Sequence, residues 1–270
     1  MGKAGRGVLA ECLPRLVTER NIDMVICNAE NAAGGSGMTP QIFGKLLRYG
    51  VDVVTLGDHV YRKREVIQSL QSSDRIIRPG NLSPLAIGRT WTAVPTKSGS
   101  AVVGVACLLG QMYMGTADSP WSAVDRIWKE MPADVKIRVL DFHAEASSEK
   151  VAMGWHLDGR ASIVFGTHTH IPTADYRILP NGTAHISDVG MTGPYDSVLG
   201  RRKDRVLAAL TTSMPTHFEV ASADPRMSAI LVTVEATTGK ATHIERIEVK
   251  GTVQTDGPYD RDDGMPGRHD

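Results

Sequence analysis

Four clusters of polar side chains each follow a short apolar run in this sequence of 270 residues. The clusters are Asn28-Ala29-Glu30-Asn31, Gly57-Asp58-His59, His143-Ala144-Glu145 and Gly166-Thr167-His168-Thr169-His170. Histidine nitrogens combined with carboxylate oxygens suit Zn, Fe or Mn as bound ions. A carboxylate can also bridge two ions with its two oxygens, and two ions about 3.5–4 Å apart are a common arrangement for cleaving phosphate esters. The residue types therefore favour metal binding and hydrolytic chemistry.

The apolar runs in front of the clusters are predicted to be strands of one sheet. They cover residues 24–27, 51–56, 137–142 and 162–165, and segments of helical periodicity separate them. One such helix begins at Thr39-Pro40, with threonine as N-cap and proline at the first helical position. The carboxyl ends of parallel strands meet at one edge of an open α/β sheet, where such folds place their sites. We therefore expect the four clusters to converge on a common pocket.

Further elements are predicted around this sheet. Helices are expected at residues 8–17, with Pro14 causing a kink or an offset start, after Arg62, at 121–130 and after Ala146, and a further strand is expected at 102–109. Two hairpins are predicted, one at 177–186 with a type I′ turn at Asn181-Gly182, and one at 227–249. Strand–helix alternation followed by hairpins indicates an α/β fold with sheets stacked between helix layers. We assign residues 1–250 to one domain and expect residues 251–270, which are polar with Gly and Pro, to form a disordered tail.

The composition excludes several classes of protein. Lys and Arg together number 30, as do Asp and Glu, so no general attraction to nucleic acid or to anionic membranes is expected. The longest apolar run, Ala101 to Leu109, is shorter than the roughly 20 residues that span a bilayer. No signal peptide opens the chain, and the three cysteines form no CxxC pair, which is typical of reduced thiols. These features predict a cytoplasmic protein without membrane association.

Each cluster taken alone has an ordinary structural explanation. A lone histidine is usually a surface or hydrogen-bonded residue, and this interpretation applies to His156, His185, His217, His243 and His269. A single His-x-His is weak evidence for metal, and Asn-Ala-Glu-Asn can also cap a helix. Four such clusters after four predicted strands are much harder to explain by chance, and their joint occurrence favours a metal site.

Five segments of the chain resemble the YmdB-like metallophosphoesterases, which belong to the calcineurin-like phosphoesterase superfamily. These segments are NAENAAGGSGMT, GDHVYRKRE, DFHAEASSEKVAMGWHLDGRAS, VFGTHTHIPTAD and RILPNGTAHISDVGMTGPYDSVLG. The resemblance runs from about Gly2 to about Val249. It implies a four-layer α/β/β/α sandwich and a two-metal phosphodiesterase acting on 2′,3′-cyclic nucleotides or other small phosphoesters, with RNA ends as a further substrate class. It also implies a homo-oligomer.

The resemblance assigns two divalent ions, Fe, Mn or Zn, to a defined set of ligands. The implied metal ligands are Glu30, Asn31, Asp58, His143, His168 and His170. Glu30 would bridge the two ions. His170 would bind the second ion, with Asn31 nearby, and the other three would bind the first ion.

The resemblance also implies residues that act on the substrate. His59 would be the catalytic proton donor to the leaving oxygen, a role that suits an imidazole titrating near neutrality. The stretch 188–195 would line the substrate cleft, with Thr192, Gly193 and Tyr195 as substrate-binding residues.

The amino terminus departs from the family pattern. The family begins with a strand ending in Gly-Asp, and that Asp binds the first metal. Here residues 1–6 already match the turn after that strand, so the first strand is missing and the ligand would lie about two positions before Met1. Two interpretations stay open: Met1 is an internal methionine of a longer protein, or the chain is short and one metal site is weakened.

A second departure is Asp58, where the family usually has Asn. Both side chains can offer an oxygen to a metal. The negative charge of Asp should tighten cation binding, and it should also reduce the acidification of a bound water.

Two other functions remain as alternatives. An amidohydrolase barrel would also use a His-x-His, but there the motif usually sits at the first strand, and the hairpin-rich carboxyl-terminal third argues against a (β/α)₈ barrel. A catalytically weak or inactive phosphoesterase-fold protein with a binding or regulatory role is supported by the absent first ligand.

Overall fold

The computed structural model describes residues 1–252, so the predicted tail lies outside the described residues except for its first two positions. The helices are α1 (Gly2–Glu19), α2 (Pro40–Arg48), α3 (Val66–Ser72), α4 (Pro120–Glu130), α5 (Ser147–His156) and α6 (Lys203–Thr212). The strands are β1 (Ile26–Asn28), β2 (Val53–Thr55), β3 (Ile76–Ile77), β4 (Trp91–Pro95), β5 (Val102–Leu109), β6 (Ile137–His143), β7 (Ile163–Thr167), β8 (Arg177–Ile178), β9 (Ala184–Ile186), β10 (Gly193–Pro194), β11 (Pro225–Val234) and β12 (Ala241–Lys250). No helix in this part of the chain is both long and apolar enough to cross a membrane.

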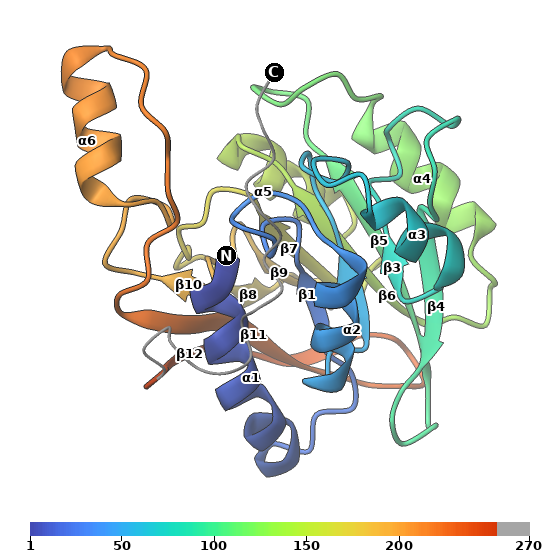
Figure 1. The fold of residues 1–270 in the computed structure, drawn as a ribbon. Coiled ribbons are helices and arrows are strands. Elements are labelled where there is room, and N and C mark those ends of the chain that lie inside the picture. The colour runs from blue at the N-terminus through green and yellow to red at the C-terminus, as the bar shows by residue number, and fades with distance from the viewer. Residues whose placement is uncertain (253–270) are drawn as a thin grey trace.

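A six-stranded sheet with the order β4-β5-β6-β7-β9-β8 lies at the centre of the molecule (Figure 1). Strands β5, β6, β7 and β9 run parallel, and β4 and β8 add antiparallel edges. Because both faces of this sheet are covered, β6 is buried along most of its length. Helices α4 and α5 cover one face, where Val124, Phe142 and Met153 share a buried cluster.

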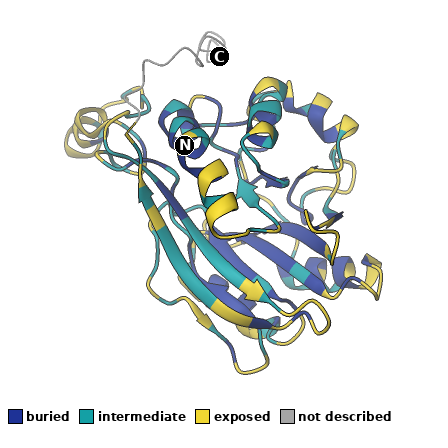
Figure 2. Cartoon of the chain, turned by 90° about the horizontal axis from the view of Figure 1, so that it is seen from below, coloured by how far each residue is buried: buried dark blue, intermediate teal, exposed yellow. Residues whose placement is uncertain are grey.

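Two smaller sheets lie over the opposite face. Strands β1, β2 and β3 form a parallel sheet, and β10, β11 and β12 form an antiparallel one. Val53 and Val139 belong to the apolar cluster between the sheets, and Ile230 packs against it. Helices α1 and α2 pack against β1–β3, where Val8 and Ile42 share a second cluster. Figure 2 shows the result: the inner strands are buried, whereas β11 and β12 carry many intermediate and exposed residues.

The sequence predicted the α/β class and the strands that precede the clusters. All four strands begin and end within two residues of the expected bounds. Helix α2 begins as predicted, because Thr39 Oγ1 accepts a hydrogen bond from the backbone N–H of Ile42. Helix α1 is a single helix that includes Pro14. Helix α6 is absent from the sequence-based assignment because it has no apolar stripe, with Val206 as its one buried residue.

The sheet topology rules out the barrel alternative. Within residues 1–252 the largest sheet is open, with β4 at one edge and β8 at the other. A (β/α)₈ barrel requires a closed ring of parallel strands, so the amidohydrolase-barrel alternative is wrong.

The turn of the first hairpin also differs from the prediction. The carbonyl of Leu179 accepts a hydrogen bond from the N–H of Gly182 at 2.9 Å, so Pro180 and Asn181 are the central residues. Gly182 has φ +100°, whereas Asn181 is not among the residues with positive φ. A type I′ turn at Asn181-Gly182 needs positive φ at both, and the ring of Pro180 directs the turn one position earlier. The type I′ prediction is therefore wrong.

A cavity of about 520 Å³ runs between α1, β1, β11 and the six-stranded sheet. Apolar side chains line most of it, including Leu13 of α1, Val139 of β6 and Ile230 of β11. Among the described strands β1 pairs with β2 alone, and residues 24–32 border the cavity. At its polar end the cavity reaches the polar clusters that follow the strands, with His143 in its wall.

Gly166 allows β7 to lie directly against the backbone of Ser187, just before the His-x-His segment. A Cβ at Gly166 would stand 1.7 Å from the carbonyl oxygen of Ser187. We expect Gly166→Ala to lower the free energy of unfolding by at least about 3 kcal/mol, because the neighbour is backbone and cannot move aside cheaply. Chemical denaturation measures this change.

Gly44 is the matched control. It lies inside α2, and the nearest atom to a Cβ there would be 3.6 Å away. Gly44→Ala should raise the stability by about 0.5–1 kcal/mol. Equal effects of the two substitutions would contradict this account of the strand contact.

Candidate metal centre

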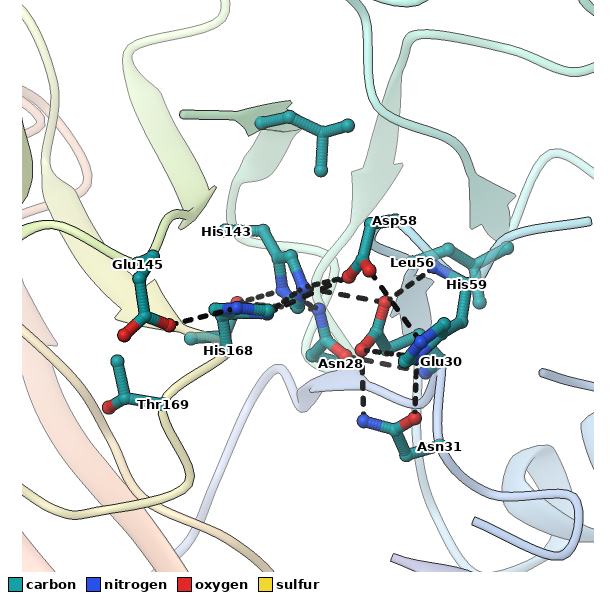
Figure 3. A network of polar contacts seen from close by, with 12 residues as sticks. Asn28, Glu30, Asn31, Leu56, Asp58, His59, His143, Glu145, His168 and Thr169 are labelled. Carbon is teal, nitrogen blue, oxygen red and sulfur yellow. Dashed lines mark hydrogen bonds and ion pairs between the residues drawn. The ribbon is translucent and has the colours of Figure 1, made fainter. Parts of the chain in front are cut away.

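Four side chains, one from each polar cluster, meet at the carboxyl ends of the strands. Single ligand atoms of Glu30, Asp58, His143 and His168 lie within 4.8 Å of one another. Because β1 pairs in parallel with β2, and β6 with β7, the chain delivers all four residues to the same place (Figure 3). The structure thus brings together four of the six predicted metal ligands in one group.

The spacing of the ligand atoms suits a metal ion. His143 Nε2 lies 3.0 Å from Asp58 Oδ1, 3.1 Å from His168 Nδ1 and 3.4 Å from Glu30 Oε2. Tetrahedral ligands with bonds of about 2.0–2.2 Å are separated by about 3.4 Å. Gly57 keeps this space open, since a Cβ there would stand 2.2 Å from Glu30 Oε2. Two nitrogens and two carboxylates form a donor set that fits Zn, Fe or Mn.

The carboxylates of the group are held ionised by their histidine neighbours. Burial alone would raise the pKa of Glu30, but the charge of His143 and a hydrogen bond from His59 hold it below its usual range. Burial likewise opposes ionisation of Asp58, but hydrogen bonds from His143 and His168 hold its pKa well below the ordinary value. Glu30 and Asp58 are therefore both ionised at neutral pH.

His143 is buried at the centre of the group, with 1% of its side chain exposed. Burial lowers the pKa of His143, but the carboxylates of Glu30 and Asp58 outweigh burial and raise it above the usual value. Its Nδ1 points away from the group, to Thr167 Oγ1 at 2.8 Å. Nε2 is therefore the nitrogen directed at an ion.

His168 is oriented by a carboxylate outside the group. Its Nε2 lies 3.1 Å from Glu145 Oε2, whereas its Nδ1 faces His143 and Asp58 (Figure 3). A carboxylate that accepts from one ring nitrogen leaves the other nitrogen free to bind a metal. The backbone of His168 has φ +98°, an unfavourable conformation for a residue with a Cβ, which turns the ring toward the group.

Asn31 connects the group to His59. Its side-chain nitrogen donates to Glu30 Oε1 at 2.9 Å, and its oxygen lies 3.0 Å from Nδ1 of His59. His59 also has its Nδ1 3.3 Å from Glu30 Oε1 and its Nε2 3.6 Å from Asp58 Oδ2. The hydrogen bond to Glu30 outweighs burial and raises the pKa of His59. About a quarter of its side chain is exposed, at 28%.

His170 lies beside Asn31 and outside the four-residue group. Its Nδ1 must carry a proton, because the partner at 3.0 Å is the carbonyl oxygen of Leu199. Its Nε2 lies 3.2 Å from the side-chain nitrogen of Asn31. Burial lowers the pKa of His170, so the neutral ring offers a lone pair on Nε2 toward Asn31. The side-chain nitrogen of Asn31 thus lies between Glu30 Oε1 and His170 Nε2.

The three predicted substrate-binding residues lie in different surroundings. Thr192 borders the same cavity as His143 and His170. Gly193 lies in β10, opposite Arg226 of β11. The ring of Tyr195 packs under the guanidinium of Arg226, 4.9 Å from its centre. The substrate role of these residues stays a prediction.

Two supporting residues of the site were not assigned a role from the sequence. Glu145 pairs with His168, and buried Asp141 accepts a hydrogen bond from Thr167 at 2.7 Å. Glu145 belongs to the predicted His143-Ala144-Glu145 cluster, but the direction in which its side chain points depends on the backbone turn after β6. Asp141 could have been noticed as a carboxylate two residues before a histidine in an otherwise apolar strand, since alternate residues share one face.

Comparison with known proteins identifies relatives along nearly the whole chain. A family model described as "YmdB-like protein" matches residues 1–247. A 2′,3′-cyclic-nucleotide 2′-phosphodiesterase of Bacillus subtilis is 39% identical over 247 residues, which are 92% of this chain and 93% of the relative. A putative phosphatase/phosphodiesterase of Mycoplasma pneumoniae is 31% identical over 97% of this chain and 93% of its own length.

Two crystal structures share this fold. A hypothetical protein of Thermus thermophilus superposes with a TM-score of 0.86 at 36% identity, over 93% of this chain and 96% of the other. A novel phosphatase of Mycoplasma pneumoniae superposes with the same TM-score of 0.86 at 30% identity, over 92% and 90% of the two chains.

Removal of one ligand from the group should weaken metal binding. We expect His168→Ala to lower the affinity for Zn²⁺ at least tenfold, whereas Asp58→Asn, which keeps an oxygen but loses a charge, should lower it less. Competition with a chromophoric chelator measures the affinity. His243→Ala, which changes an exposed histidine of β12, is the control. Unchanged affinity in His168→Ala would exclude His168 as a ligand.

Metal binding should also depend on pH in a definite direction. Since the pKa of His143 is raised, its proton begins to compete with an ion above the ordinary histidine pKa of about 6.5. Below that raised pKa, the apparent affinity should fall by about tenfold per pH unit for each proton displaced. Titrations with Zn²⁺ at several pH values test this. An affinity that does not change as the pH falls would contradict it.

Proposed function

We propose that this chain, which belongs to the YmdB-like protein family, is a metal-dependent phosphodiesterase that opens 2′,3′-cyclic nucleotides. The observation that carries the proposal is the group of Glu30, Asp58, His143 and His168 at the carboxyl ends of β1, β2, β6 and β7. The similarity to the phosphodiesterase of Bacillus subtilis supports the substrate class. A four-layer α/β/β/α stack and self-association stay expectations from the family resemblance, and a cytoplasmic location stays an expectation from the sequence.

The two oxygens of Glu30 support its role as a bridge between two ions. Oε2 lies on the side of His143, at 3.4 Å from its Nε2. Oε1 lies on the other side, where it accepts from Asn31, which in turn neighbours His170. We propose that Asp58, His143 and His168 would hold one ion together with Glu30, and that His170, with Asn31 nearby, would hold the other. Such a pair of ions supplies a water of depressed pKa and neutralises charge on the phosphoryl oxygens.

His59 is placed to donate a proton to the leaving ribose oxygen. Its Nδ1 is occupied by Asn31 Oδ1 and Glu30 Oε1, which leaves Nε2 as the nitrogen able to face a substrate. The raised pKa of His59 favours the protonated ring that a general acid requires. A ribose alkoxide is a poor leaving group, so this proton should matter at the step that breaks the P–O bond.

The test uses the purified chain loaded with Mn²⁺ and assayed on 2′,3′-cyclic AMP. We expect His59→Gln to lower the turnover number by about 10²–10⁴-fold with the bound metal unchanged, because general acid catalysis is worth about that much. His243→Gln, on exposed β12, is the matched control and should keep full activity. Metal content and product formation are measured on the same samples.

The results of this test distinguish an active phosphodiesterase from an inactive protein of the same fold. Protein that binds metal but opens no cyclic phosphodiester would favour the inactive, regulatory form of this fold. Full activity in His59→Gln would remove His59 from the mechanism while leaving the phosphodiesterase assignment intact.

A further inference from the structure

Asp188 is a buried carboxylate behind the His-x-His segment, and the proposed reaction gives it no role. It follows β9, the strand that pairs in parallel with β7, and 1% of its side chain is exposed. Its cationic partner is Lys150 of α5, which is 3% exposed and donates from Nζ to Asp188 Oδ2 at 2.7 Å. Because burying two charges is costly, packing of the apolar core alone does not account for this pair.

The ion pair is tied to the loop at Thr169, the middle residue of the His-x-His segment. The backbone N–H of Thr169 donates to Asp188 Oδ2 at 3.1 Å, and its hydroxyl donates to the same oxygen at 2.9 Å. Lys150 Nζ also donates to the carbonyl of Thr167 at 2.8 Å, one residue before His168. The pair therefore holds the backbone on both sides of His168.

The two histidines beside Thr169 face different partners. His168 Nδ1 lies 3.1 Å from His143 Nε2 in the metal group, whereas His170 Nε2 lies 3.2 Å from the side-chain nitrogen of Asn31. Both histidines have positive φ, at +98° and +66°. A residue with a Cβ keeps such a backbone only where its surroundings enforce it. Thr169, held from behind between two strained residues, is the point from which the two rings diverge.

We propose that Asp188, with its charge balanced by Lys150, is a positioning residue that holds Thr169 and thereby directs the two neighbouring histidines to different partners. The proposal rests on the candidate metal site but not on the proposed reaction. Oδ2 accepts from the ammonium and from both donors of Thr169, and Oδ1 accepts from the backbone N–H of Gly190 at 2.9 Å. Four donors thus meet two oxygens, an arrangement that suits a group that can only accept.

Two double variants separate the acceptor oxygen from the buried charge. Both replace Lys150 by Met, so neither leaves a lone charge in the interior. Asp188→Asn/Lys150→Met keeps an oxygen for the donors of Thr169, whereas Asp188→Leu/Lys150→Met leaves no acceptor on the side chain. Val124→Ala, which opens a cavity in the buried cluster under α4, is the control for lost stability alone.

Two measurements on the full chain report the effect. Amide hydrogen exchange of residues 167–171 in metal-free protein reports whether the loop is held, and competition with a chromophoric chelator reports the affinity for Zn²⁺. We expect Asp188→Leu/Lys150→Met to exchange faster in this segment and to bind Zn²⁺ about 10–100-fold more weakly, as substitutions behind metal ligands do. Asp188→Asn/Lys150→Met and Val124→Ala should bind Zn²⁺ as the wild type does, because both keep an acceptor for Thr169.

Thr169 offers a matched pair of variants that leaves the ion pair intact. Thr169→Ser keeps the hydroxyl and should match the wild type in both measurements. Thr169→Val removes one hydrogen bond to Asp188, so its loop should exchange faster and it should bind Zn²⁺ about two- to tenfold more weakly. Thr169→Val that matches Thr169→Ser in both measurements would overturn the proposal.

The double variants can overturn it as well. Wild-type affinity in Asp188→Leu/Lys150→Met would do so, and so would equal losses in the two double variants, because the charge and not the acceptor would then be responsible. A loss of the same size in Val124→Ala would show that the affinity follows stability alone, and the positioning role would fail.

Neither measurement depends on catalysis. If the variants behave as expected in a chain that hydrolyses no cyclic nucleotide, the proposed reaction fails while the role of Asp188 stands. If hydrolysis is found but Asp188→Leu/Lys150→Met keeps the wild-type affinity and exchange, the reverse holds.

Discussion

The parallel register of β6 and β7 is the constraint on which the site depends. Pairing places His143 opposite Thr167, so the residue after Thr167 is His168, the next member of the candidate group. A slip of one residue would turn His143 to the other face of the sheet. Apolar residues on both faces of β6 resist such a slip, because Val139 and Leu140 belong to different buried clusters. The packing of the core thereby determines which atoms can meet an ion.

The loop that carries both histidines of His-x-His is strained and is held by a buried ion pair. His168 and His170 have φ of +98° and +66°, each of which costs about 1–3 kcal/mol for a residue with a Cβ. Between them Thr169 donates from its N–H and its hydroxyl to Asp188 Oδ2, at 3.1 and 2.9 Å. Lys150 neutralises Asp188 at 2.7 Å and also donates to the carbonyl of Thr167. Both charges of this buried pair have further hydrogen-bond partners, so removing either one would leave the other buried without compensation and would release the loop.

Local pattern predicted that the residues of the candidate group would converge, but not the contacts that orient them. Strands 24–27 and 137–142 could be recognised from their apolar runs, and the clusters follow directly from the strand ends. By contrast, Asn28 reaches Asp141 across 113 residues of sequence, a contact that only the sheet order creates. The edge strand β4 and the exposed helix α6 were missed because neither buries a continuous apolar face. The turn lies one residue earlier than the Asn-Gly motif predicts, because the fixed φ of Pro180 suits the first central position of a turn.

The raised histidine pKa values and the candidate metal site have one electrostatic cause. Glu30 and Asp141 are 2% and 0% exposed, and burying carboxylates without a compensating charge is costly. In the chain alone, protons on His143 and His59 supply that compensation, which is why the pKa of each lies above its usual value. A divalent cation would supply more charge at the same place and would displace the proton on His143. A group that holds protons this firmly between paired carboxylates is therefore one that favours a bound cation.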